Sequence, residues 1–193
     1  MDEGELIARS QQGNVAAFNQ LVLAYQEMVY NVALRILGDP EAAADATQDA
    51  LISAFQSIRS FRGGNFKVWL LRIVTNACYD VLRSRKRHPS SSLDEMVEQD
   101  ESGGFEPASS LESPEDYSLR RDLQAEVQRG LQLLPPDQRV AVVLSDVHGL
   151  SYEEIAVVTK SSLGTVKSRL SRGRARLRDF LTERELIPAT VRQ

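Results

Sequence analysis

The chain has few of the residues that build disulfides and metal sites. Its 193 residues include one cysteine, Cys78, and two histidines, His88 and His148. A single cysteine excludes an intrachain disulfide and a zinc site made of several thiolates. The two histidines stand alone, without the spacing of metal ligands. We therefore expect no metal and no other cofactor.

Long apolar runs are also missing. No stretch reaches the roughly 18 consecutive apolar residues that a membrane helix needs. The first residues, MDEGELIARSQQG, carry acids where a secretory signal has an apolar core. Apolar residues make up 42% of the chain and charged residues 26%, as in ordinary soluble globular proteins. These features predict a cytoplasmic protein without membrane insertion.

Signatures of catalysis are absent as well. The sequence contains no nucleophile and base at a recognisable spacing, no phosphate-binding loop and no metal-ligand cluster. The adjacent glycines Gly63 and Gly64 are by themselves too weak a signal for a nucleotide site. The chain is therefore not expected to be an enzyme.

Charge is segregated along the chain. The net charge of −4 argues weakly against nucleic-acid binding. Residues 160–178, however, hold seven Lys or Arg and no acid, and residues 83–87 hold four more basic side chains. Between these blocks, residues 89–118 hold nine acids and no Lys or Arg. Each basic block could contact phosphates while the acidic stretch stays in solvent or is repelled by DNA.

The spacing of apolar residues predicts helices through the first half, and no period-two strand pattern is present. Apolar steps of three and four residues predict three helices, over residues 15–37, 40–58 and 66–86. Asp39 is the expected N-cap of the second helix, with Pro40 at its first position. Paired glycines predict a loop over 61–65. These helices are expected to form one bundle.

The last two predicted helices form a helix-turn-helix. Ser151 and Glu154 have the spacing of a capping box at the start of a short helix, and Ser162 is the expected N-cap of the last helix, over 163–182. Lys160 occupies the turn position where φ is positive and glycine is usual, which costs about 1 kcal/mol. The last helix is strongly basic, as is typical of a helix that enters the major groove of DNA.

A change of composition separates the two helical halves. Residues 88–117 are rich in Ser, Pro, Gly and acids, which is typical of a flexible linker. Helical periodicity returns near Ser118 and again over 137–147. The chain is therefore predicted to be all-α. Its expected parts are an N-terminal helical bundle over 1–87, the flexible acidic linker, and a C-terminal helix-turn-helix domain over 118–193.

The N-terminal part of the last helix is the candidate DNA-reading surface. Val166, Leu170 and Leu177 define an inward face, so the residues between them point outward. The first residues of a recognition helix contact base edges, while flanking Lys and Arg bind phosphates. The expected DNA contacts are Thr165, Lys167, Ser168, Arg169 and Arg172. The alternative is a basic face that is merely solvated.

Two long segments resemble one protein family. The first, from residue 45 to 87, is DATQDALISAFQSIRSFRGGNFKVWLLRIVTNACYDVLRSRKR. It resembles region 2 of the extracytoplasmic-function (ECF, group 4) RNA polymerase sigma factors of the sigma-70 family. The second, from residue 133 to 178, is LLPPDQRVAVVLSDVHGLSYEEIAVVTKSSLGTVKSRLSRGRARLR, which resembles region 4. The resemblance implies binding to core RNA polymerase, recognition of promoter DNA and transcription initiation.

The resemblance assigns a polymerase-binding role to one helix of region 2. The residues that would bind the clamp helices of the polymerase β′ subunit are Asp45, Thr47, Gln48, Asp49 and Phe55. Asp45 and Asp49 share a helix face and could meet basic residues of a partner. Taken without the resemblance, they can equally be ordinary solvated acids.

A second set of region 2 residues would open and hold the −10 element, because aromatic rings stack on single-stranded bases and basic side chains hold the backbone. The set comprises Phe61, Asn65, Phe66, Asn76, Tyr79, Asp80, Arg83, Arg85, Lys86 and Arg87. The alternative for Phe66 and for Trp69 is a place in the core. The loop between Phe61 and Trp69 is also shorter than in many relatives.

Region 4 would bind the −35 element through the last helix, and the flap of the polymerase β subunit through the surface around 137–154. An anti-sigma factor is a further partner expected at the level of the family. Two alternatives from other classes stay open. The first is a free-standing helix-turn-helix transcriptional regulator with residues 1–87 as a sensor or dimerisation module. The second is an adaptor that binds only proteins.

Overall fold

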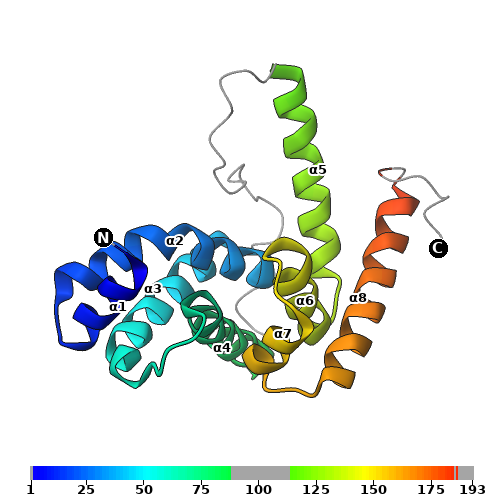
Figure 1. The fold of residues 1–193 in the computed structure, drawn as a ribbon. Helices are drawn as coiled ribbons and strands as arrows, with labels where there is room; N and C mark the ends of the chain where they lie inside the picture. Colours follow the sequence, from blue (N-terminus) through cyan, green and yellow to red (C-terminus); the bar gives the residue numbers. More distant parts are fainter. Residues whose placement is uncertain (1, 88–113, 185, 187–193) are drawn as a thin grey trace.

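The computed structural model describes residues 2–87, 114–184 and 186, and every regular element within them is a helix (Figure 1). Most of the expected linker lies outside these residues. The predicted all-α fold, with an N-terminal bundle and a C-terminal helix-turn-helix, is confirmed.

The helices of the N-terminal half are α1 (Glu3–Gln11), α2 (Val15–Leu37), α3 (Pro40–Ser57) and α4 (Phe66–Arg87). A short 3-10 helix, Ile58–Ser60, extends α3. The predicted helices that correspond to α2, α3 and α4 are confirmed. Helix α1 has no counterpart among the predicted helices, because its two buried residues, Leu6 and Ser10, give too short a periodic signal.

Local side-chain chemistry sets where these helices begin and end. The side chain of Asn14 accepts a hydrogen bond from the first turn of α2 and caps it. Gly38 ends α2 in the left-handed region, with φ at 74°. Asp39 then accepts a hydrogen bond from the N–H of Glu41, and Pro40 opens α3. The predicted cap and helix start are therefore confirmed.

Alanines bring α3 close to its neighbours α2 and α4. The inward stripe of α3 consists of Ala43, Ala46, Ala50 and Ala54, all of them buried. The facing side chains are larger, and the fully buried ones include Val29, Val32 and Ile36 of α2 and Leu71 and Val74 of α4. Because alanines fill the inward stripe, the larger side chains of α3 lie at its margins or face solvent.

The helices of the C-terminal half are α5 (Pro114–Gln132), α6 (Pro136–Val142), α7 (Tyr152–Thr159) and α8 (Leu163–Glu183). A π-helical turn, Val143–Val147, continues α6, so the helix predicted over 137–147 is confirmed with a change of hydrogen-bond pattern. Helix α5 begins at Pro114, inside the segment predicted as linker. Proline fits this position because the first turn of a helix needs no N–H there.

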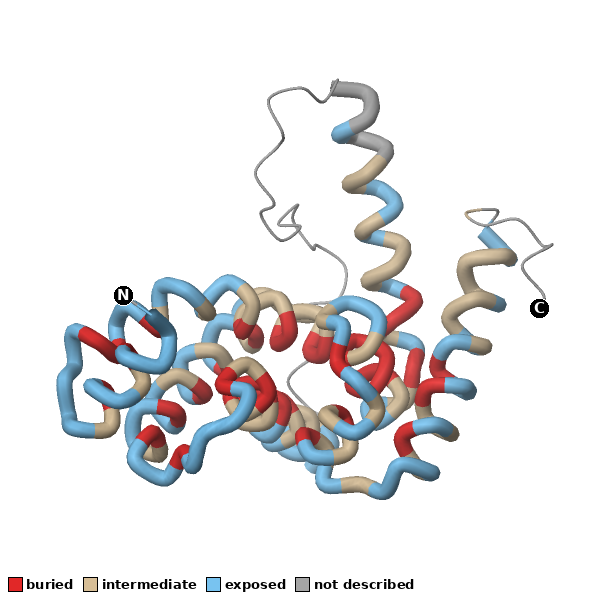
Figure 2. Tube along the Cα trace, in the orientation of Figure 1, coloured by how far each residue is buried: buried red, intermediate tan, exposed pale blue. Residues whose placement is uncertain are grey.

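The two halves of the chain pack against each other (Figure 1). Helix α4 lies against α7, and the end of α2 contacts α5 and α6. Figure 2 shows buried segments from both halves meeting in this region. The prediction of two domains joined by a flexible linker did not include such a contact. Several predicted site residues lie at or near this contact, so it determines which side chains surround them.

Candidate nucleic-acid interface

The helix-turn-helix is built from α7, a tight turn and α8. At the start of α7, the hydroxyl of Ser151 accepts from the N–H of Glu154 at 3.1 Å, and the Glu154 carboxylate accepts from the N–H of Ser151 at 2.9 Å. Lys160 follows α7 with φ at 50° and ψ at 44°, in the left-handed region. Both the capping box and the positive φ at Lys160 are confirmed.

Helix α8 packs through a narrow inward stripe. Ser162 caps it by accepting a hydrogen bond from the N–H of Thr165 at 3.2 Å. Val166 and Leu170 are buried, as predicted. Gly173 is buried on the same stripe, and a Cβ there would lie 2.8 Å from Cγ2 of Val142. Gly173 is not among the residues predicted to face inward, because a glycine adds nothing to an apolar pattern.

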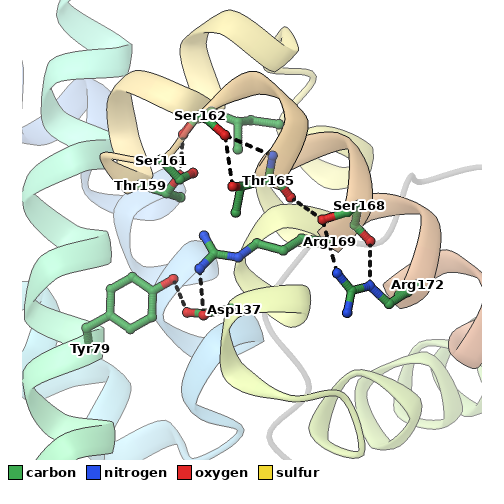
Figure 3. Close-up of polar contacts among 10 residues, drawn as sticks. Tyr79, Asp137, Thr159, Ser161, Ser162, Thr165, Ser168, Arg169 and Arg172 are labelled. Carbon is green, nitrogen blue, oxygen red and sulfur yellow. Dashed lines mark hydrogen bonds and ion pairs between the residues drawn. The ribbon is translucent and has the colours of Figure 1, made fainter.

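The outer face of the first turns of α8 carries most of the predicted −35 residues (Figure 3). Lys167 and Arg172 are exposed, and Thr165 and Ser168 are half-buried. Ser168 donates to the backbone carbonyl of Thr165 at 2.9 Å and accepts from Arg172 at 3.1 Å. Ser168 thus links Arg172 to the backbone of the first turn of the helix.

Arg169 differs from its neighbours because it points into the body of the protein (Figure 3). Its Nη2 lies 2.7 Å from Oδ2 of Asp137 on α6, and its side chain is 23% exposed. The other oxygen of Asp137 accepts a hydrogen bond from the hydroxyl of Tyr79 at 3.1 Å. Burial and the charge of Asp137 raise the pKa of Tyr79. One carboxylate thus joins a predicted −10 residue to a predicted −35 residue.

Arg174 holds α8 in place against the preceding elements. Its Nη2 lies 2.5 Å from Oδ1 of Asp146 and 3.1 Å from the hydroxyl of Ser145. The hydrogen bond to Asp146 is the main cause of the raised pKa of Arg174. Arg174 is not among the predicted site residues, because Asp146 lies 28 residues away, outside the local window in which charge pairs can be recognised.

The predicted −10 residues of α4 lie along its outer face. Asn76 and Asp80 are exposed, and Tyr79 is half-buried beside them. Arg83 pairs with Asp80 at 2.5 Å and donates to the backbone carbonyl of Tyr79 at 3.3 Å. The spacing of three and four residues places all four side chains on one side of the helix.

The loop before α4 presents one polar side chain to the other half of the chain. Asn65 is exposed, and its Oδ1 accepts from the N–H of Val68 at 3.2 Å, which caps α4. Its Nδ2 donates to the carboxylate of Glu154 on α7 at 3.2 Å. Asn65 is therefore engaged by the helix-turn-helix in this conformation.

Phe61 and Phe66 are core residues in this structure. Their exposed fractions are 8% and 2%, and their rings meet edge to face with centroids 5.6 Å apart. Trp69 is half-buried and completes the cluster, with its ring centroid 5.3 Å from that of Phe66. The core alternative considered for Phe66 therefore describes this conformation. The two phenylalanines support the loop from beneath and do not face solvent.

The basic cluster at the end of α4 divides into two kinds of side chain. Arg83, Lys86 and Arg87 are exposed. Arg85 forms an ion pair with Asp39 and donates to the backbone carbonyl of Leu37 at 3.5 Å. Arg85 thus ties α4 to the corner between α2 and α3.

The outer face of α3 carries the predicted polymerase-binding residues. Asp45, Gln48 and Asp49 are exposed, whereas Thr47 is half-buried and donates to the backbone carbonyl of Ala43 at 2.7 Å. The aromatic member, Phe55, is 40% exposed. The exposed apolar residues of this helix also include Ile52, at 47%, which the sequence analysis did not name.

The part of the chain that the structure describes offers neither a membrane helix nor a metal site. None of its helices combines the length and the apolar character that crossing a bilayer requires. No group of three or more His, Cys, Asp or Glu side chains among these residues is arranged to hold a metal ion.

Comparison with known families shows which class of protein carries these helices. The family model described as Sigma-70 region 2 matches residues 21–88, and the one described as Sigma-70, region 4 matches residues 124–177. The chain is 37% identical over 171 residues to the RNA polymerase sigma-H factor of Pseudomonas aeruginosa, covering 88% of this chain and 89% of that one. This chain belongs to the ECF sigma factors. It therefore binds core RNA polymerase and directs promoter recognition, and its family is not one of enzymes.

Two further likenesses agree with this assignment. The chain is 38% identical over 178 residues to the ECF RNA polymerase sigma factor SigE of Mycolicibacterium smegmatis, covering 91% of this sigma factor and 66% of that protein. Its fold is similar to that of the sigma factor RpoE in complex with the anti-sigma factor NepR from Bartonella quintana. The TM-score is 0.66 at 32% identity, over 86% of this chain and 96% of that one. Membership of the family decides against a free-standing regulator and an adaptor that binds only proteins.

Proposed function

We propose that this sigma factor divides promoter recognition among three surfaces. The outer face of α8 reads the −35 duplex, the outer face of α4 and the loop before it hold the −10 strand, and the outer face of α3 binds the β′ clamp helices. The observation that carries the proposal is the packing of α8. Val166, Leu170 and Gly173 turn inward, which leaves Lys167 and Arg172 exposed beside the capped N-terminus of the helix.

Reading of the −35 element rests on the first turns of α8. Arg and Lys bind guanine edges in the major groove, and hydroxyls contact any base or phosphate. We assign base contacts to Lys167, Ser168 and Arg169, and phosphate contacts to Thr165 and Arg172. Arg169 reaches DNA after it leaves Asp137, so its guanidinium exchanges a carboxylate for the acceptor atoms of a base edge.

Holding of the −10 strand rests on the polar side of α4. Asn76 and Asp80 offer hydrogen bonds to base edges, and Tyr79 offers a ring for stacking. The remaining members of the predicted set take supporting roles: Asn65 in the loop, Phe61 and Phe66 beneath it, and Arg83, Arg85, Lys86 and Arg87 along the backbone. Arg85 reaches phosphate only if its pair with Asp39 opens.

Binding to the polymerase rests on two more surfaces. On α3 these are Asp45, Thr47, Gln48, Asp49 and Phe55. The exposed Asp45 and Asp49 suit basic residues of the β′ clamp, and the exposed ring of Phe55 adds apolar area. The surface around 137–154 would meet the β flap. The partners place the sigma factor in the cytoplasm, where the chromosome is transcribed.

The division of the chain follows the three surfaces. We propose domains over 1–87 and 118–193, joined by a linker over 88–117 that spans the distance between the two promoter elements. An anti-sigma factor is the remaining partner that we propose, because the similar RpoE structure is a complex with one.

The test is transcription in vitro from a randomised promoter library, with bacterial core polymerase and with or without this protein. Initiation that depends on the protein, at sites sharing two motifs at a fixed spacing, is the expected result and would give the promoter. If core polymerase gains no initiation while the protein alone shifts duplex DNA, the assignment of these surfaces is wrong.

A further inference from the structure

We propose that the N-terminal helix α1 holds the −10 loop in the position in which it meets DNA, with Gln11 as the positioning residue. The −10 loop is the segment over 61–65, between the short 3-10 helix and α4. Helix α1 precedes the segment that the region 2 family model matches. The inference rests on the function proposed above, because the role of this loop at the −10 strand comes from it.

The side-chain amide of Gln11 binds the start of the loop. Its Nε2 donates to the backbone carbonyl of Phe61 at 2.7 Å and to that of Ile58 at 3.2 Å. Ile58 opens the 3-10 helix and Phe61 follows its last residue, so one amide spans the whole turn. A glutamine amide carries two N–H groups and can satisfy two carbonyls. Because a helix end leaves its carbonyls unpaired, this contact fixes the point at which the chain leaves the helix.

The other end of the loop is fixed where α4 begins. The carbonyl of Asn65 accepts from the N–H of Trp69 at 3.1 Å, and its Oδ1 accepts from the N–H of Val68 at 3.2 Å. Between the two ends, Gly63 and Gly64 have φ at 88° and 93°. Apart from adjacent residues, no atom of the described chain lies within 4 Å of the position that a Cβ would take on either glycine. The two ends therefore set the course of the loop.

A second contact connects α1 to the aromatic side chains that support the loop. Tyr25 of α2 packs edge to face against Phe66, with ring centroids 5.4 Å apart. The hydroxyl of Tyr25 donates to the carboxylate of Glu3 in the first turn of α1. The ring of Phe61 lies in the same cluster, with its centroid 5.4 Å from that of Trp69. Helix α1 is thus connected to the loop through its first turn as well as its last.

Gln11 and its neighbour Gln12 differ in their surroundings although their side chains are the same. Gln11 is half-buried at the end of α1, whereas Gln12 is exposed. The buried residues of α1 are Leu6 and Ser10, which pack the helix against the bundle. Gln11 is therefore not needed to fill the core, and its side chain serves the loop. The pair offers a substitution and a control of the same chemistry at adjacent positions.

The position of the loop matters because base recognition depends on geometry. Residues 62–65 are exposed, so they are the part of the loop that can touch the −10 strand. A binding group has to be held within about 0.5 Å of its productive position, usually by hydrogen bonds from residues behind it. Without Gln11 the loop is held at one end only, and its glycines let the backbone move. Contacts of α8 with the −35 duplex do not depend on Gln11.

The experiment compares Gln11→Glu with the matched control Gln12→Glu in the full chain with core polymerase. Glutamate has the size of glutamine, but its carboxylate has no N–H to donate and places oxygens against the two carbonyls. Both variants add the same charge at adjacent positions. Transcription is measured from promoters that differ by one base in the −10 element, and from promoters that differ by one base in the −35 element. The matched promoter is the one given by the randomised library.

Gln11→Glu is expected to lower the preference for the matched base by about fivefold or more at one or more −10 positions, which is the loss of one base contact. Preferences within the −35 element should stay as in the wild type, and Gln12→Glu should keep both sets. An unchanged −10 preference in Gln11→Glu would overturn the inference. So would an equal loss in Gln12→Glu, or a loss that is the same for every promoter, since a residue that only stabilises the fold acts on all promoters alike.

A measurement without DNA separates this inference from the function on which it rests. Trp69 is the single tryptophan of the chain and packs against Phe61, so its fluorescence reports on the start of the loop. In the free protein, acrylamide should quench Trp69 more strongly in Gln11→Glu than in the wild type or in Gln12→Glu.

Unchanged quenching in Gln11→Glu would show that Gln11 does not hold the loop, whatever the promoter assay gives. Stronger quenching with intact −10 preferences would show that α1 holds the loop but that the loop does not read the −10 strand, which overturns its proposed role. Should Gln11→Glu lose its helical circular dichroism, Gln11→Met replaces it in both measurements, with Gln12→Met as its control. Methionine also removes the donor and adds no charge.

Discussion

At the scale of single residues, Arg139 shows how many backbone carbonyls one buried guanidinium can bind. Its guanidinium donates to the carbonyls of Gln132 at 2.8 Å and Leu134 at 3.1 Å within region 4, and to that of Ile36 in region 2. Burial lowers the pKa of Arg139, so these carbonyls are what keep the charged side chain in place.

We predict that Arg139→Met destabilises the protein by about 2–4 kcal/mol, because it leaves several carbonyls without a donor. The measurement is urea unfolding followed by circular dichroism. The matched control is Arg176→Met on the exposed side of α8, which should stay within about 0.5 kcal/mol of the wild type. A loss at Arg139 no larger than that at Arg176 would contradict the role of the buried guanidinium.

Arg169 allows the most direct test of how the protein recognises the DNA sequence of the −35 element. We predict that Arg169→Ala lowers the preference for a matched over a scrambled −35 element by about 1–3 kcal/mol, or roughly 5- to 150-fold. Core polymerase binding should be unchanged. The readout is the ratio of transcription from the two promoters, which cancels any effect of the substitution on the amount of active protein.

The control for Arg169 is Arg176→Ala, an arginine further along α8 that, unlike Arg169, is exposed. It should lower transcription from both promoters alike or leave both unchanged. If Arg169→Ala also weakens both promoters by the same factor, Arg169 binds phosphate and does not read a base.

His148 gives the protein a sensitivity to acid. Its Nε2 is buried and has no hydrogen-bond partner among the described residues. Burial, and then the charges of Lys67 on α4 and Arg35 on α2, lower the pKa of His148 to about 4. The ordinary value is 6.5, so between these values the unfolded chain binds more protons than the folded one. Stability contributed by neutral His148 is present above pH 6.5 and is lost as the pH falls toward 4.

We therefore predict that the melting temperature falls more steeply for the wild type than for His148→Gln when the pH is lowered from 7 to 4.5. Carboxylates titrate in both proteins, so the difference between the two curves isolates the histidine. Parallel curves would show that His148 is not held neutral by the fold.

At the scale of the element, the turn of the helix-turn-helix carries a local strain. Lys160 has φ at 50°, where a side chain is disfavoured and glycine is not. Its side chain is exposed. We predict that Lys160→Gly raises stability by up to about 1 kcal/mol, measured by thermal unfolding. Affinity for the −35 duplex should be unchanged, and a lower melting temperature would show that the lysine side chain itself stabilises the turn.

Most elements could be predicted because their signals are local. The caps at Asp39, Ser151 and Ser162 act on residues two or three positions away, and the inward stripe of α8 follows the helical period. Two features escaped for physical reasons. Helix α1 buries too few residues to show a period, and Gly173 is needed for a close approach that no apolar pattern records.

Aromatic residues mark the limit of prediction at this scale. Phe61 and Phe66 are aromatic residues beside a polar loop, as is typical of a site that stacks on bases. In this structure both side chains are buried. A ring that stacks on a base and a ring that fills a core have the same side chain, and only the packing around them tells the two apart.

At the scale of the whole molecule, the N-terminal bundle should keep its fold when contacts between the two halves are removed. Cys78 lies in the core of the N-terminal bundle, and burial raises the pKa of its thiol to about 12. We predict that Cys78 stays unreactive to a thiol reagent at pH 8 in the wild type and in the Asp137→Ala, Gln128→Ala variant, which removes hydrogen bonds between the two halves of the chain. It should react only in denaturant. Rapid labelling of the variant in buffer would mean that loss of these hydrogen bonds disrupts region 2 itself.

The sequence by itself determined the helices, their caps, the two regions and the family, because each of these is written in residues close together or in long matched segments. Only the tertiary structure decided that Asp137 joins Tyr79, 58 residues away, to Arg169, 32 residues away. It also decided that side chains of α5 and α6 cap α2. Such contacts depend on how two helical bodies meet, and no periodic pattern within either body specifies that meeting.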